Sequence, residues 1–111
     1  MGPALSLVVH PTTHPKPYTA RNSPVITCVD GTVLSIQASG QHLCTPQDNE
    51  GPYTHLEVGR ISKDNAPQSW GPYQEKFDDG GWYESDIWIR IPVALVEECI
   101  YIHGGEQVAS T

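Results

Sequence analysis

Alternating and helical hydrophobic patterns divide the 111-residue chain into a short series of predicted elements. The clearest is VITCVDGTVLSIQA, residues 25–38, where β-branched residues flank Asp30-Gly31. This dipeptide favours a two-residue hairpin turn, because Gly readily adopts positive φ. Cys28 and Val33 would fall on the face opposite the apolar one. The predicted cross-strand pairs are Val29 with Thr32, Thr27 with Leu34, and Val25 with Ile36.

Two further strands and one helix follow from periodicity. The segment YTHLEVGRI, residues 53–61, alternates apolar and polar positions, and WYESDIWIRI, residues 82–91, places three isoleucines on one face. Residues 92–105 predict a helix with Pro92 at its start and Gly104-Gly105 at its end. Its apolar arc would hold Val93, Leu95, Val96, Cys99, Ile100 and Ile102. Residues 39–52 and 62–81 are predicted connections.

These elements predict a small α+β domain over residues 25–111. It would contain an antiparallel sheet of about four strands, with the amphipathic C-terminal helix packed on one face. Residues 1–24 contain five prolines and predict an extended, Pro-rich arm, because proline removes hydrogen-bond donors and biases its neighbours away from helix. Within it, LSLVV (5–9) could pair as an edge strand, and the arm could mediate self-association.

Charge separates the arm from the domain. Residues 1–29 hold two basic residues and no acidic one, a net charge of +2. Residues 30–111 hold all 13 acidic residues against four basic ones, a net charge of −9. Such a domain repels nucleic-acid phosphates but attracts proteins that bind them, so we expect a protein partner and no direct contact with nucleic acid.

Composition limits the cellular locations that we expect for the protein. No segment approaches the roughly 20 apolar residues of a membrane span, and we see no signal peptide. Three cysteines without a CxxC pair favour reduced thiols in a cytosol. We therefore expect a protein of the host cytoplasm, without a membrane or cofactor.

His42 and Cys44 lie just before the segment TPQDNEGPYTHLEVG, residues 45–59, which itself contains His55. Cys44 could be a nucleophile with a histidine base, or the three could form a weak metal site. A structured turn explains the segment better, because it is built from turn-forming residues and Pro52 favours an extended start to the strand. The turn formers are Asp48, Asn49 and Gly51.

A second candidate site is EKFDDGGWYESDIW, residues 75–88, where acidic residues surround aromatic ones. A solvated loop covering the core edge is one interpretation. The other is a protein-binding surface, with aromatic anchors and carboxylates that take the place of phosphates in a basic groove. The candidate partner-binding residues are Glu75, Phe77, Asp78, Asp79, Trp82, Glu84 and Asp86.

Residues 33–105 resemble a group of small phage and prophage proteins without a settled activity. The resemblance rests on SIQAS (35–39), HLCTPQDNEGPYTHLEVG (42–59), IRIPVALVEE (89–98) and HGG (103–105). It implies a phage genome. The similar proteins usually carry Arg where this chain has Gln47, which argues against an anion-binding turn here.

Three functions follow as hypotheses. The favoured one is a phage-encoded, non-enzymatic inhibitor that occludes the nucleic-acid-binding surface of a host protein, as an anti-defence protein of the anti-CRISPR type would. The first alternative is a virion structural or assembly component that uses its N-terminal arm, and it would place the protein in the virion. The second alternative is a small metal-binding protein or enzyme that uses His42, Cys44 and His55.

Overall fold

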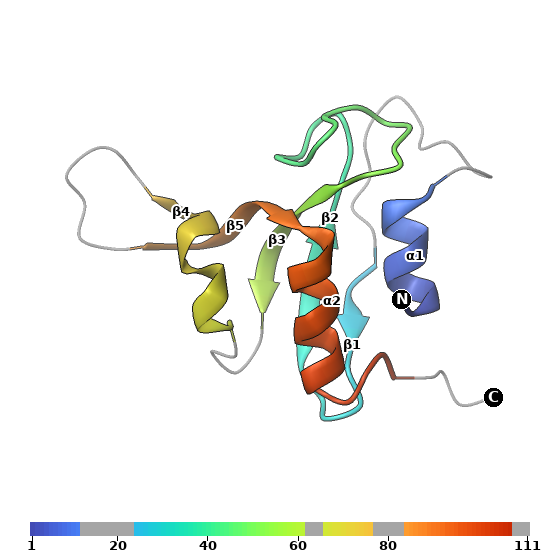
Figure 1. The fold of residues 1–111 in the computed structure, drawn as a ribbon, viewed down its shortest axis with the longest axis vertical. Helices are drawn as coiled ribbons and strands as arrows, with labels where there is room; N and C mark the ends of the chain where they lie inside the picture. Colours follow the sequence, from blue (N-terminus) through green and yellow to red (C-terminus); the bar gives the residue numbers. More distant parts are fainter. Residues whose placement is uncertain (12–23, 62–65, 77–83, 108–111) are drawn as a thin grey trace.

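A computed structural model describes residues 1–11, 24–61, 66–76 and 84–107. Two helices, a 3-10 helix and five strands lie in these ranges (Figure 1). In chain order they are α1 (Pro3–Val9), β1 (Ile26–Thr27), β2 (Val33–Gln37), β3 (His55–Ile61), η2 (Gln68–Tyr73), β4 (Gln74–Lys76), β5 (Glu84–Pro92) and α2 (Val93–Ile102).

The strands form one antiparallel sheet in the order β1-β2-β3-β5-β4. Helix α2 follows β5 directly and lies across the sheet, while α1 lies beside β1 and η2 beside β5 (Figure 1). The α+β class, the antiparallel sheet and the C-terminal helix are confirmed. The sheet has five described strands where about four were predicted.

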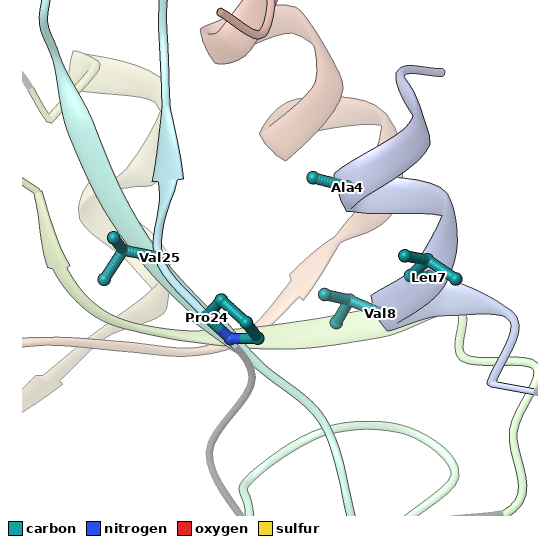
Figure 2. A pocket seen from close by; sticks show the side chains of 5 residues that line it. All are labelled: Ala4, Leu7, Val8, Pro24 and Val25. Atoms are coloured by element: carbon teal, nitrogen blue, oxygen red, sulfur yellow. The ribbon is translucent and has the colours of Figure 1, made fainter. Parts of the chain in front are cut away.

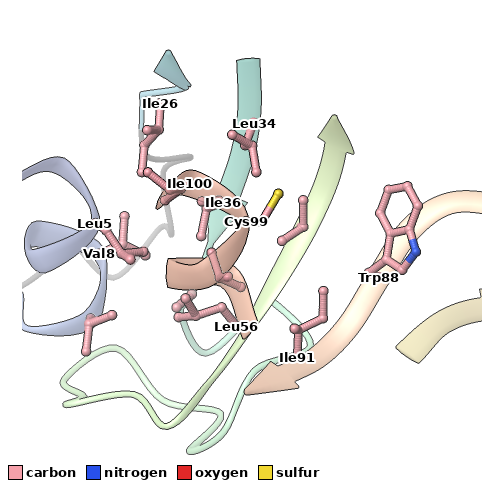
Figure 3. Packing of buried hydrophobic residues seen from close by; sticks show 14 of the residues in the cluster. Leu5, Val8, Ile26, Leu34, Ile36, Leu56, Trp88, Ile91, Cys99 and Ile100 are labelled. Carbon is pink, nitrogen blue, oxygen red and sulfur yellow. The ribbon is translucent and has the colours of Figure 1, made fainter. Parts of the chain in front are cut away.

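The hydrophobic core lies between the two helices and one face of the sheet (Figure 3). Strands β2 and β3 contribute alternate residues, as their patterns predicted, and α2 contributes Val96, Cys99 and Ile100. The predicted helical arc is wrong at one position, because Ile102 is 61% exposed. The α2 helix ends at the predicted glycines, where Gly104 and Gly105 adopt φ of 94° and 85°.

The predicted hairpin register is wrong by one residue. Thr27 pairs with Val33 instead of Leu34, and Ile26 pairs with Leu34. The N–H of Cys28 donates to the carbonyl of Thr32, so the loop is three residues long and ends at Gly31, with φ of 92°. The slip buries Ile26 and Cys28, and leaves Val25 and Val29 exposed.

The segment LSLVV, expected as an edge strand, lies instead in α1. Leu5, Val8 and Val9 are buried, and Leu5 and Val8 point toward α2 and the sheet in Figure 3. These positions have the i, i+3, i+4 spacing of a helical face, and Pro3 suits the first turn. Residues 3–9 are therefore helical and not extended, while residues 12–23 of the predicted arm lie outside the described part.

Glu106 and Gln107, near the C-terminal end of the chain, form hydrogen bonds that hold α1 and β1 in place. Both carboxylate oxygens of Glu106 accept N–H groups at the start of α1, from Ala4 at 2.8 Å and Leu5 at 3.0 Å. A side chain at Gly2 would collide with this carboxylate. The N–H of Gln107 donates to the carbonyl of Thr27, so the chain's last described residues pair with the outer edge of β1.

The predicted connection 62–81 contains structure that its sequence pattern did not reveal. Trp70 in η2 is fully buried and packs edge-to-face on Trp88 of β5, with ring centroids 5.7 Å apart. Strand β4 follows η2 and pairs with β5, which extends the sheet at its far edge. A turn-rich sequence thus carries an aromatic anchor and an edge strand.

Candidate functional site

The segment that follows β2 is a hydrogen-bonded turn, as its residues predicted. Asp48 Oδ1 accepts the N–H groups of Glu50 and Gly51, and the Tyr53 hydroxyl donates to the Asp48 carbonyl at 2.6 Å. Burial is the main cause that raises the pKa of Tyr53 to about 12. The turn is joined to α1, because the Tyr53 N–H donates to the Val9 carbonyl.

A β-bulge holds the first half of this loop on the sheet. Two residues of β5, Ile89 and Arg90, lie opposite the single residue Glu57 of β3. Arg90 adopts a φ of 47°, and its N–H donates to the Leu43 carbonyl at 3.0 Å. The Leu43 N–H in turn lies 3.4 Å from Glu57 Oε1. The strained Arg90 backbone is thus explained by loop anchoring.

Cys44 lies inside the structure. Its side chain is 1% exposed, and its thiol donates to the carbonyl oxygens of Ser39 and Pro46 at 3.2 and 3.3 Å. A thiol that donates hydrogen bonds is protonated, and an external substrate cannot reach it in this conformation. These contacts favour a structural role for Cys44.

The two histidines beside Cys44 each contact a hydroxyl group. His42 Nδ1 lies 2.7 Å from Ser39 Oγ, and His55 Nδ1 lies 2.8 Å from Thr54 Oγ1. Among the described residues, no three His, Cys, Asp or Glu side chains are arranged to hold a metal ion. The described part of the chain therefore contains no set of side chains arranged to bind the metal ion that the metal hypothesis requires.

The predicted partner-binding residues belong to one hairpin. Lys76 of β4 pairs with Glu84 of β5, so Phe77, Asp78, Asp79 and Trp82 lie between two paired strands, outside the described residues. Glu75 lies in β4 and is partly buried, while Glu84 and Asp86 lie in β5. The fold thus brings Glu75 of β4 and the acidic start of β5 onto two neighbouring strands at the edge of the sheet (Figure 1).

A polar cluster that the sequence did not reveal joins the first hairpin to the end of α2. His103 Nδ1 donates to Asp30 Oδ2 at 2.7 Å, and Thr32 Oγ1 lies 3.3 Å from the same nitrogen. Asp30 and His103 lie 73 residues apart, and no local pattern in the sequence links them. His103 Nε2 is buried and has no hydrogen-bond partner among the described residues.

Two buried thiols lie close to this cluster. Burial is the main cause that raises the pKa of Cys99 to about 12, with smaller contributions from Cys28 and Asp30. Burial likewise raises the pKa of Cys28. Both thiol side chains are fully buried and their pKa values are raised, so neither offers a reactive thiolate near neutral pH.

The described surface has two small hollows. One, of about 120 Å³, is an apolar groove between α1 and the start of β1, where Leu7 and Val8 face Pro24 and Val25 (Figure 2). None of the described residues that line this groove has a polar side chain that would orient a ligand. The other, of about 180 Å³, lies beside the last turns of α2, and its lining includes Tyr101, Glu97 and Glu106.

Comparison with known proteins supplies no relative. No family model, curated protein or solved structure matches the chain. The phage resemblance therefore stays a prediction. No helix in the described ranges has the length and apolar character needed to cross a membrane.

Proposed function

We propose that this chain is a small acidic binding protein that occludes a basic, nucleic-acid-binding surface of a host protein. In the setting that the sequence resemblance implies, it would act as a phage-encoded anti-defence protein of the anti-CRISPR type. The observation that supports the proposal best is the pairing of Lys76 with Glu84. This pairing brings the two ends of the acidic, aromatic segment 75–86 side by side.

The position of the hairpin suits an interaction surface. Strand β4 is an outer strand, at the opposite edge of the sheet from β1 (Figure 1). Trp88 of β5 pairs with Gln74 of β4 and packs on Trp70, so the described end of the hairpin is anchored to the core. An anchored base reduces the conformational entropy that a binding surface loses on association.

The net charge of the chain determines which class of partner it would attract. The chain carries a formal net charge of −7, and five of its 13 acidic residues lie within residues 75–86. The carboxylates gathered in this segment would attract a lysine- and arginine-rich surface and speed its encounter with the inhibitor. The same field repels nucleic acid, so the expected mechanism is stoichiometric competition with nucleic acid for one surface.

The test is a pull-down from host lysate with the tagged full chain, at low and at high salt, followed by mass spectrometry. One nucleic-acid-handling protein, lost at high salt, is the expected result, because screening weakens exposed charge pairs. Recovery of only the chain itself or of virion proteins would contradict it. In that case the virion alternative would gain support.

The structure restricts which residues of the N-terminal arm could contact a neighbouring subunit under the virion alternative. Helix α1 buries Leu5, Val8 and Val9 in the chain's own core. These residues therefore cannot also lie along a neighbouring subunit in this conformation. Any such contact by the predicted arm would need residues beyond α1.

A further inference from the structure

The last turn of α2 exposes large apolar side chains. Tyr101 is 80% exposed and Ile102 is 61% exposed, although both belong to a helix whose other face lies in the core. Val29 is also exposed and lies against the helix end, because its N–H donates to the Gly105 carbonyl. We call Val29, Tyr101 and Ile102 the helix-end patch. Tyr101 also lines the hollow of about 180 Å³ beside the helix.

Acidic side chains surround this patch. Glu97 and Glu106 line the same hollow, Glu98 is exposed on α2, and Asp30 follows Val29 in the hairpin turn. The last turn of α2 carries no basic residue. Glu97 Oε1 lies 3.0 Å from the Met1 ammonium group, so a cation already occupies this edge of the hollow. An apolar centre with a polar rim is the usual anatomy of a protein-binding surface.

The charge of the rim discriminates between two occupants. A second copy of this chain, docked symmetrically, would place each acidic rim against itself, and such like-charge contacts are unfavourable. A basic surface that carries an apolar side chain would pair its cations with the rim and insert the apolar group beside Tyr101. Charge complementarity therefore favours a cationic partner over self-association.

We infer that the helix-end patch is a second docking surface for a basic, amphipathic segment of a partner protein. It is separate from the β4–β5 hairpin, and its occupancy does not require that the hairpin bind. Tyr101 is the anchor, since a large aromatic side chain supplies contact area at low entropy cost. Glu98, which is exposed, supplies charge that selects cationic segments, and a cationic group of the partner would compete with the Met1 ammonium group for Glu97.

The test uses a synthetic amphipathic peptide built from leucine and lysine, titrated into the full chain and followed by amide chemical-shift mapping. The largest shifts are expected at Tyr101 and Ile102, with saturable binding. A peptide with glutamate in place of lysine, and one with serine in place of leucine, should each bind at least about tenfold more weakly. Equal binding of all three peptides would overturn the inference.

Substitutions test whether the peptide binds at the helix-end patch. Tyr101→Gln with Ile102→Gln should weaken binding at least about tenfold, while the matched control Leu7→Gln, at an apolar residue that is 69% exposed on α1, should not. Glu97→Lys with Glu98→Lys should abolish it. Unchanged affinity in both helix variants, or shifts centred on β4 and β5, would refute this surface and leave the hairpin proposal standing. A dimer in sedimentation that Tyr101→Gln dissociates would overturn the choice of occupant.

Discussion

Asp30 Oδ2 lies 2.7 Å from Nδ1 of His103, and this contact joins the turn of the first hairpin to the end of α2. Thr32 fixes the same carboxylate from the other side, because its N–H donates to Asp30 Oδ1 at 2.9 Å. The hydrogen bond from the Thr32 backbone is the largest cause of a pKa of about 2 for Asp30, followed by the Thr32 hydroxyl and His103.

This lowered pKa predicts a specific acid dependence of stability. In the unfolded chain the Asp30 carboxyl regains an ordinary pKa of roughly 4. Its contribution is therefore fully present above about pH 4 and is lost as the pH falls toward about 2. Asp30→Asn should be less stable than the parent at neutral pH and should lose less stability in that acid range. Urea unfolding at a series of pH values checks this, and parallel curves for the two proteins would contradict it.

The burial of α1 predicts that its apolar face is needed for stability. Leu5→Ala should lower the free energy of unfolding by about 2–5 kcal/mol, because it removes a fully buried side chain and leaves a cavity. Leu7→Ala, one residue outside this face and exposed to solvent, is the matched control and should change it by less than about 0.5 kcal/mol. Equal effects in chemical denaturation would show that α1 does not pack as described.

The Glu106 carboxylate predicts a link between the two ends of the chain. Glu106→Ala should destabilise α1 by about 1–2 kcal/mol, as loss of a helix N-cap does, because the N–H groups of Ala4 and Leu5 lose their acceptor. Glu98→Ala, an exposed residue on α2, serves as the control. Hydrogen exchange should speed at Ala4 and Leu5 in the first variant only; unchanged protection there would contradict the cap.

The burial of all three cysteines predicts that the native protein resists thiol reagents. Cys28, Cys44 and Cys99 are each at most 1% exposed, and burial raises the pKa of Cys28 and Cys99. Labelling near neutral pH should therefore be slow in buffer and complete in denaturant. Fast labelling of Cys44 in the folded state would revive the catalytic hypothesis. Cys44→Ala should then remove the fast phase.

The sequence predicted most strands and the helix because their patterns are local. The strand at 53–61 and the helix ending at Gly104 follow from periodicity and capping alone. The hairpin register could not be settled this way, since both registers offer apolar faces and only packing against α2 selects Ile26 and Cys28. The α1 signal was present in the spacing of Leu5, Val8 and Val9, but the surrounding prolines outweighed it.

Whether a candidate site could be predicted also depends on whether its contacts are local in the sequence. The turn at Asp48 was predictable because each contact is made within a few residues. The Asp30–His103 contact was not, because it depends on how the sheet places the hairpin against α2. The acidic hairpin was predicted as a segment, while its strand pairing came only from the fold.

The most direct measurement of the central claim is the affinity of hairpin variants for the captured nucleic-acid-handling partner. Asp78→Lys with Asp79→Lys should abolish binding while the circular dichroism spectrum stays unchanged. Glu75→Lys in β4 should weaken binding at least about tenfold. Glu50→Lys is the matched control, because it also brings the formal net charge from −7 to −5. Glu50 lies in the exposed turn, so this substitution should change the affinity little. Unchanged affinity in the hairpin variants, or equal losses from Glu75→Lys and Glu50→Lys, would contradict the account.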